Sequence, residues 1–185
     1  MLRRLLLDRA IVVDEWRYLE EGADAAALGD AAALGGPPAL EDAGLAPGTA
    51  GGRWILPYER WLAARAAWRL PPRATGVLLE PTHAIERIGP ALANFSLIAV
   101  RFPSPSDGRG YTQGRLLRER WGFTGELRAV DYVRHDQLFF LARCGFNAFE
   151  LPEHEFPGAL AALGTFTAEY QASNDAGLAM PLRHR

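Results

Sequence analysis

Apolar residues gather in short runs along the chain, separated by segments with a different spacing. Such runs occur at 53–57 (RWILP), 75–81 (TGVLLEP), 96–102 (SLIAVRF) and 125–130 (GELRAV). An apolar run of this length is typical of a strand buried on both faces of a parallel sheet. The pattern therefore predicts a series of buried strands, joined by the segments between them.

The intervening segments carry apolar residues at helical spacing. We predict helices within 58–68, 83–92, 112–121, 132–144 and 155–163, and further strands at 147–151 and 164–171. Thr82 and Asp131 stand where they could cap two of these helices, and Gly122 and Gly145 stand where helices end. Alternating strands and helices predict an α/β fold. We expect a mostly parallel sheet of about four to six strands with crossover helices, either open or closed into a partial barrel.

The amino-terminal third has a different composition. Residues 9–19 (RAIVVDEWRYL) alternate weakly and predict a small β arm or hairpin. Residues 20–52 are rich in Ala, Gly and Pro and contain six acidic residues but no basic one, which predicts a flexible acidic linker. We therefore divide the chain into this arm and linker (1–52) and an α/β domain (53–185).

Composition and charge narrow the classes of function. The 185 residues are 49% hydrophobic and 23% charged, with a net charge of −2, which is ordinary for a globular protein and gives no general attraction to nucleic acid. All twenty basic residues are arginine, so a Schiff-base or general-base lysine is excluded. The amino-terminal apolar run is interrupted at Asp8, and no stretch is long enough to cross a membrane. We expect a cytoplasmic protein without a membrane partner.

Cysteine and histidine usage bears on cofactors. Cys144 is the single cysteine, so the chain can form neither an internal disulfide nor a cysteine-ligated cluster, and its apolar neighbours predict a structural thiol. The histidines lack the spacing of metal ligands, and we expect no metal site. Any redox cofactor would have to be bound noncovalently or be held by a partner.

The loop at 106–112 (SDGRGYT) has the features of an anion site. Gly108 and Gly110 can expose backbone N–H groups where the next helix begins, and Arg109 supplies a guanidinium fork. Arg115 and Arg118 follow one helical turn apart. In parallel α/β folds such loops meet at the carboxyl ends of the strands, which predicts an oxyanion site for sulfite, phosphate or a carboxylate.

Two other interpretations of this segment remain open. The arginines can form a solvated helix face, with Arg115, Arg118 and Arg120 paired to Glu119 and Glu126. The glycines at 108, 110 and 114, with Asp131 at the end of the next strand, also resemble the outline of a dinucleotide-binding loop. The bulk of Arg109 argues against the second, because a pyrophosphate needs close approach to the backbone.

The segments 102–130 (FPSPSDGRGYTQGRLLRERWGFTGELRAV) and 133–151 (VRHDQLFFLARCGFNAFEL), together with the later EYQ, resemble the bacterial domain-of-unknown-function family 934. The resemblance spans about residues 53–171 and is densest over 102–151. Members of that family are labelled oxidoreductases of sulfite reduction. The label implies a role in the pathway that contains the sulfite reductase haemoprotein more firmly than it implies a particular reaction. Asp131-Tyr132 departs from the Gly-Asp usual in the family, which weakens a ribose-binding role for Asp131.

These observations give our working hypothesis: an accessory protein or oxidoreductase of assimilatory sulfite reduction, with an arginine-rich rim that binds an oxyanion or a partner. One alternative is a noncatalytic module that docks on sulfite reductase or on its electron donor. Another is a barrel-type enzyme acting on a small anionic metabolite, with Asp107, Asp131 or Glu150 as acid or base. No catalytic residue is assigned. The predicted anion-binding residues are Arg109, Arg115, Arg118, Arg128, Gly108 and Gly110, and the residues predicted to shape the site are Asp107, Tyr111, Asp131, Asp136 and Gln137.

Overall fold

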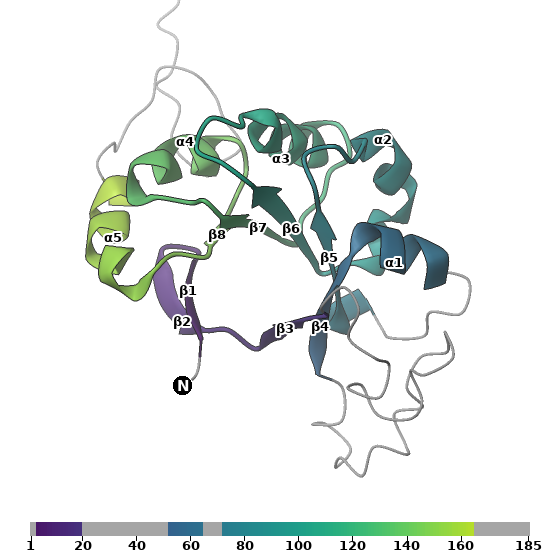
Figure 1. The fold of residues 1–185 in the computed structure, drawn as a ribbon, viewed down its shortest axis with the longest axis horizontal. Coiled ribbons are helices and arrows are strands. Elements are labelled where there is room, and N and C mark those ends of the chain that lie inside the picture. Colours follow the sequence, from purple (N-terminus) through teal and green to yellow (C-terminus); the bar gives the residue numbers. More distant parts are fainter. Residues whose placement is uncertain (1–2, 20–51, 65–71, 165–185) are drawn as a thin grey trace, which may run out of the picture.

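The computed structural model describes residues 3–19, 52–64 and 72–164, and shows an eight-stranded sheet curled into an open half-barrel (Figure 1). The strand order is β2-β1-β8-β7-β6-β5-β4-β3. Strands β3 to β8 run parallel to one another, whereas β1 runs antiparallel to both β8 and β2. The strands are β1 (Arg4–Leu7), β2 (Ala10–Val13), β3 (Trp16–Tyr18), β4 (Arg53–Pro57), β5 (Thr75–Leu79), β6 (Leu97–Phe102), β7 (Glu126–Asp131) and β8 (Ala148–Phe149).

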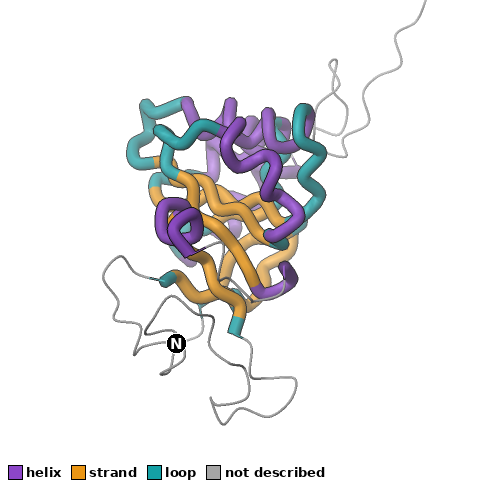
Figure 2. Tube along the Cα trace, turned by 90° about the vertical axis from the view of Figure 1, so that its right-hand side faces the viewer, coloured by secondary structure: helices purple, strands orange, loops and turns teal. Residues whose placement is uncertain are grey.

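Helices cover the convex face of the sheet (Figures 1 and 2). They are α1 (Tyr58–Ala64), α2 (Ile85–Ile88), α3 (Arg109–Glu119), α4 (Leu138–Arg143) and α5 (Phe156–Gly164). Short 3₁₀ turns precede or follow them at Pro72–Ala74, Gly89–Asn94, His135–Gln137 and Glu153–Glu155. The predicted α/β class with crossover helices is confirmed, although the sheet has more strands than expected and β1 runs antiparallel to both of its neighbours.

The amino-terminal arm contributes to both ends of the sheet. Strand β1 pairs with β8 at one end, and β3 pairs with β4 at the other, so residues 3–19 cross the open side of the half-barrel. The predicted linker over 20–52 lies outside the described residues apart from Gly52. The predicted strand at 164–171 lies outside them apart from Gly164, which is the last residue given for α5.

The central strands of the sheet are buried on both faces. Side chains such as Val77 and Ile98 pack under the helices, while their neighbours Leu78 and Leu97 pack on the concave face with Trp16. All five residues of β5 are buried. This double burial explains why the strands lack the alternation of apolar and polar residues that a one-sided sheet shows.

Two predicted helix caps are wrong. Helix α2 begins after Ala84 without a side-chain cap, so Thr82 does not cap it. Asp131 is the last residue of β7 and has φ 75°, and helical structure resumes only at His135. There the Gln137 side chain accepts a hydrogen bond from the backbone N–H of Arg134 at 2.9 Å. Gly122 and Gly145 do adopt positive φ at the ends of α3 and α4, as predicted.

None of the helices in the described part of the chain is both long and apolar enough to span a membrane.

Candidate functional site

Helix α3 packs against the sheet through a stripe of small and buried residues. Gly110, Gln113, Gly114 and Leu117 recur at the spacing of one helix face. A Cβ at Gly110 would lie 2.5 Å from Cζ of Phe102, so this position needs glycine for close packing. Gly108 precedes the helix in ordinary backbone conformation, with φ −84°. The observed role of Gly110 is therefore helix–sheet contact.

Arg109 forms a local ion pair at the start of α3. Its Nε lies 3.0 Å from Oδ1 of Asp107, and its Nη2 lies 2.7 Å from Oδ2 of the same carboxylate. These hydrogen bonds from Arg109 hold the pKa of Asp107 below its ordinary value. The Arg109 guanidinium and the Asp107 carboxylate thus form a bidentate pair with each other.

Arg115 points into solvent from the outer face of α3. Its Nε donates to Oε1 of Glu119 at 2.9 Å, a pairing one turn along the helix, and 63% of its side chain is exposed. This geometry matches the solvated-face interpretation for Arg115.

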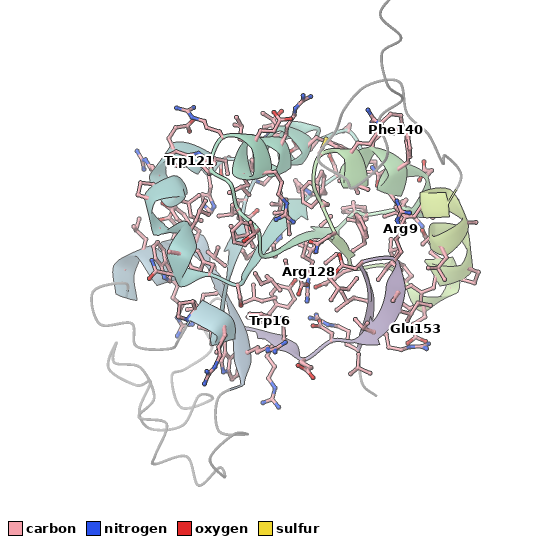
Figure 3. All side chains as sticks on the ribbon, turned by 180° about the vertical axis from the view of Figure 1, so that it is seen from behind. Arg9, Trp16, Trp121, Arg128, Phe140 and Glu153 are labelled. Atoms are coloured by element: carbon pink, nitrogen blue, oxygen red, sulfur yellow. The ribbon has the colours of Figure 1, made fainter. Side chains whose placement is uncertain are left out.

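Arg128 lies on the concave side of the half-barrel (Figure 3), because Leu127 and Ala129 on either side of it face the helices. Its side chain is 0% exposed and donates to Asp14, Glu126 and Glu150 at 2.8–3.1 Å. Carboxylates therefore surround this guanidinium, and the sheet separates it from α3.

Arg118 has a different set of partners. Its Nε donates to the carbonyl oxygen of Gly145 at 2.8 Å, and Nη1 donates to the carbonyl oxygens of Phe123 and Gly125. Its Nη2 lies 3.2 Å from Oδ1 of Asn147. All of these acceptors are formally neutral, and no carboxylate of the described residues forms an ion pair with Arg118. Within the part of the chain that the structure describes, its positive charge is therefore not neutralised by direct contact.

Arg118 lines a cavity of about 630 Å³. Thr124 and Asn147, which come just before β7 and β8, place this cavity at the amino edge of the sheet, where those strands begin. Arg9, in the turn between β1 and β2, lies on the same side as α4 and α5 (Figure 3). The polar lining consists of Asp8, Arg9, Arg118, Thr124 and Asn147, and the remaining lining consists of Ala142, Gly145, Phe146, Phe149 and Leu163.

Charge is distributed unevenly across this cavity. Burial lowers the pKa of Arg118, and the carboxylate of Asp8 acts in the opposite direction. Asn147 stands between the two, because its Nδ2 donates to Oδ1 of Asp8 at 3.1 Å while its Oδ1 faces Arg118. A neutral amide thus separates the carboxylate from the guanidinium, and each retains capacity for a further partner.

The residues predicted to shape the site lie at the opposite, carboxyl edge. Asp107, Tyr111 and Asp131 follow or end β6 and β7, and Asp136 and Gln137 lie in the turn after β7. The ring of Tyr111 packs against Phe102 at 5.3 Å between centroids, and burial raises the pKa of its hydroxyl. The structure therefore does not bring the four predicted arginines together. Arg109 lies at the carboxyl edge, Arg115 on the outer face of α3, Arg118 at the amino edge and Arg128 on the concave face.

A row of charges at the carboxyl edge was missed by sequence reasoning. Arg101, near the end of β6, lies 2.6 Å from Oε1 of Glu80 and 2.8 Å from Oδ2 of Asp131, across the ends of three adjacent strands. Its Nη1 hydrogen-bonds Glu80, whereas its Nε–H is not directed at the Asp131 oxygen. The sequence signal that could have identified this row is Arg101 itself, a charged residue within the apolar run at 96–102.

Few side chains in the described residues are suited to metal binding or to thiol chemistry. In the described ranges, no cluster of three or more His, Cys, Asp or Glu side chains is placed to hold a metal ion. Cys144 is partly buried, and burial raises the pKa of its thiol above the ordinary value. A raised pKa leaves little of the thiolate form at neutral pH.

Comparison with known proteins gives one family match. No curated protein matches the chain. A family model, described as a bacterial protein of unknown function (DUF934), matches residues 76–180, which include α3, the strands around it and most of the cavity lining. The chain belongs to this family of bacterial proteins.

Proposed function

We propose that this protein binds a small anion in the cavity beside Arg118 and acts as an accessory protein of assimilatory sulfite reduction. The observation that carries the anion-binding part is a partly buried guanidinium at the wall of a 630 Å³ cavity, whose hydrogen-bond acceptors among the described residues are all neutral oxygens. The pathway rests on the family resemblance alone.

The electrostatic reason is the cost of removing a charge from water. A guanidinium that has lost part of its hydration is stabilised when a negative charge enters the same low-dielectric environment. Arg9 adds a second positive charge at the cavity, while Asp8 subtracts one. The lining therefore carries a net positive charge that an anionic guest would complement.

The carboxylates named for the enzyme alternative support a binding role more than acid–base catalysis. Asp107 is held by Arg109, Asp131 lies against Arg101, and Glu150 accepts from Arg128 and from the Tyr18 hydroxyl. Each of these three carboxylates is therefore already engaged by an arginine.

Calorimetric titration with sulfite, sulfate and phosphate tests the anion site. We expect Arg118→Gln to weaken binding about tenfold or more, since a charge-assisted hydrogen bond is lost. Arg115→Gln is the matched control, because Arg115 lies on the same helix but points into solvent beside Glu119. Equal weakening by both variants, or none by either, would count against the cavity as the anion site.

Growth of a deletion strain tests the pathway separately. The strain should grow on cysteine but poorly on sulfate, and the wild-type gene should restore growth where a gene encoding Arg118→Gln does not. Normal growth of the deletion strain on sulfate, without a second copy of the gene in the genome, would remove the sulfur assignment and leave anion binding untouched.

A further inference from the structure

We propose that the guest of this cavity is an organic acid with an apolar body and an amino or hydroxyl donor near its acid group, and not a bare inorganic oxyanion. This inference rests on the proposed anion binding and adds the chemical class of the ligand. It follows from the size of the cavity, its apolar wall and the arrangement of its charges.

Size comes first. The cavity of 630 Å³ falls in the range of about 300–1,000 Å³ typical of pockets for organic ligands of many atoms. Sulfite or phosphate has only four or five heavy atoms and would leave most of that volume to water. A ligand with a carbon skeleton fills more of it.

The wall away from the charges is apolar. Ala142 of α4 and Leu163 of α5 line the cavity together with Phe146 and Phe149, which belong to the core under the helices. Covering such a surface with the apolar part of a ligand is favourable in proportion to the area removed from water. An inorganic oxyanion offers no apolar surface for this wall.

The charged wall offers two different partners at separate points. Arg118 can take the acid group of a ligand, while Asp8 accepts only one hydrogen bond through its side chain, from Asn147, among the described residues. A carboxylate of this kind repels a second anion but accepts an N–H or O–H donor. The row Asp8–Asn147–Arg118 is therefore suited to a ligand whose acid group and donor group lie a few bonds apart.

The backbone at Arg9 points to the same cavity. Leu7 pairs with Ala10, so Asp8 and Arg9 form a two-residue hairpin loop with φ 47° and 65°. Glycine or asparagine is preferred in such a loop, because other side chains are strained at positive φ. The chain nevertheless has an arginine at this strained position, and that residue lines the cavity.

The test compares four probes by calorimetry on the full chain: sulfite, acetate, hexanoate and 2-aminohexanoate. Each methylene that becomes buried should strengthen binding about fourfold, so hexanoate should bind at least about tenfold more tightly than acetate. The added amino group should strengthen binding further, through Asp8. Sulfite should resemble acetate.

Variants assign these effects to residues. Asp8→Asn, which tolerates the positive φ, should abolish the preference for 2-aminohexanoate over hexanoate. Arg9→Gly should weaken all four anions while leaving the melting temperature equal to or above that of the wild type, because glycine relieves the strain. Arg109→Gly is the control outside the cavity and should leave affinity unchanged.

The outcomes separate the two proposals. If sulfite and acetate bind as tightly as hexanoate, the organic-acid class is wrong while the anion site stands. If no probe binds, or if Arg9→Gly and Arg118→Gln leave every affinity unchanged, both proposals are wrong.

Discussion

Arg118 differs from the other arginines of the predicted site in the charge of its partners. Arg109, Arg115 and Arg128 each contact a carboxylate, whereas Arg118 contacts carbonyl and amide oxygens. Gly145 makes this possible, because its φ of 98° turns the chain so that its carbonyl meets Nε of Arg118 and its Cα lies against the arginine stem. The position of the Arg118 side chain at the cavity therefore depends on Gly145 as well as on the arginine itself.

Replacing Gly145 with alanine should therefore damage both stability and binding. The new Cβ would collide with Cγ of Arg118 and would also sit at unfavourable positive φ, which together should cost about 2–4 kcal/mol. Gly122→Ala shares the positive φ but meets open space, so it should cost only about 1 kcal/mol. Chemical denaturation measures both. Similar losses in the two variants would contradict the proposed contact with Arg118.

The sequence could locate the arginines but not sort them. Helical spacing places Arg115 and Arg118 one turn apart. In the structure Arg115 faces solvent, whereas Arg118 lies at the edge of the buried face of the helix. Partners such as Asp14 and Asn147 come from distant segments of the chain, and their identity depends on the tertiary fold. Local patterns therefore predicted helix α3 well and its charge partners poorly.

Helix α3 is seated on the sheet by glycine. Gly110 lies against Phe102 and Gly114 against Phe146, so two of the three glycines in the pattern that resembles a nucleotide-binding loop have a packing role. The close approach fixes the depth of the helix and so the position of Arg118 at the cavity. Element packing and site geometry are therefore coupled.

The sign of one substitution tests this coupling. Alanine is a better helix former than glycine by about 1 kcal/mol, so Gly114→Ala would stabilise a loosely packed helix. Because its Cβ would collide with the ring of Phe146, we expect a net loss of about 1–2 kcal/mol in the free energy of unfolding. Urea denaturation measures the difference, and a gain in stability would contradict the close packing of α3.

An ion-pair network connects the segment that crosses the open side of the half-barrel to the opposite part of the sheet. Asp14, between β2 and β3, reaches across the concave face to Arg128 on β7. Arg128→Met should cost about 3–5 kcal/mol, because among the described residues it leaves Glu126 without a counter-charge and leaves Asp14 and Glu150 with only the partly exposed Arg3. The same substitution at the exposed Arg109 should cost at most about 1 kcal/mol. Comparable effects in thermal or chemical unfolding would contradict a structural role for the Arg128 network.

This network also predicts the acid response of the fold. Burial alone would raise the pKa of Asp14, but hydrogen bonds and charge from Arg128 hold it below the ordinary 3.8. A lowered pKa in the folded state adds stability above that ordinary value, and this stability is lost as pH falls through the lowered pKa. Asp14→Asn should therefore be less stable at neutral pH and lose less stability below about pH 4. Identical acid profiles for wild type and variant would exclude Asp14 as the source.

The α/β class and the buried parallel strands follow from the apolar runs, because burial on both faces leaves a local signature. The role of residues 3–19 could not be predicted from the sequence, because a weakly alternating segment gives no indication that it will pair at both ends of one sheet. The anion site that we propose lies at the opposite edge from the one predicted for a related reason. The rule that ligands bind at carboxyl edges concerns the edges of a sheet, whereas the partners of each arginine determine where positive charge remains.

The arginine side-chain N–H signals in a ¹H–¹⁵N spectrum, followed during titration with the tightest-binding anion, test anion binding at Arg118 most directly. We predict that the Nε–H signal of Arg118 moves and saturates, while that of Arg128, enclosed by carboxylates, stays fixed. Movement of the Arg109 and Arg115 signals with an unchanged Arg118 signal would contradict the assignment of the anion to this cavity.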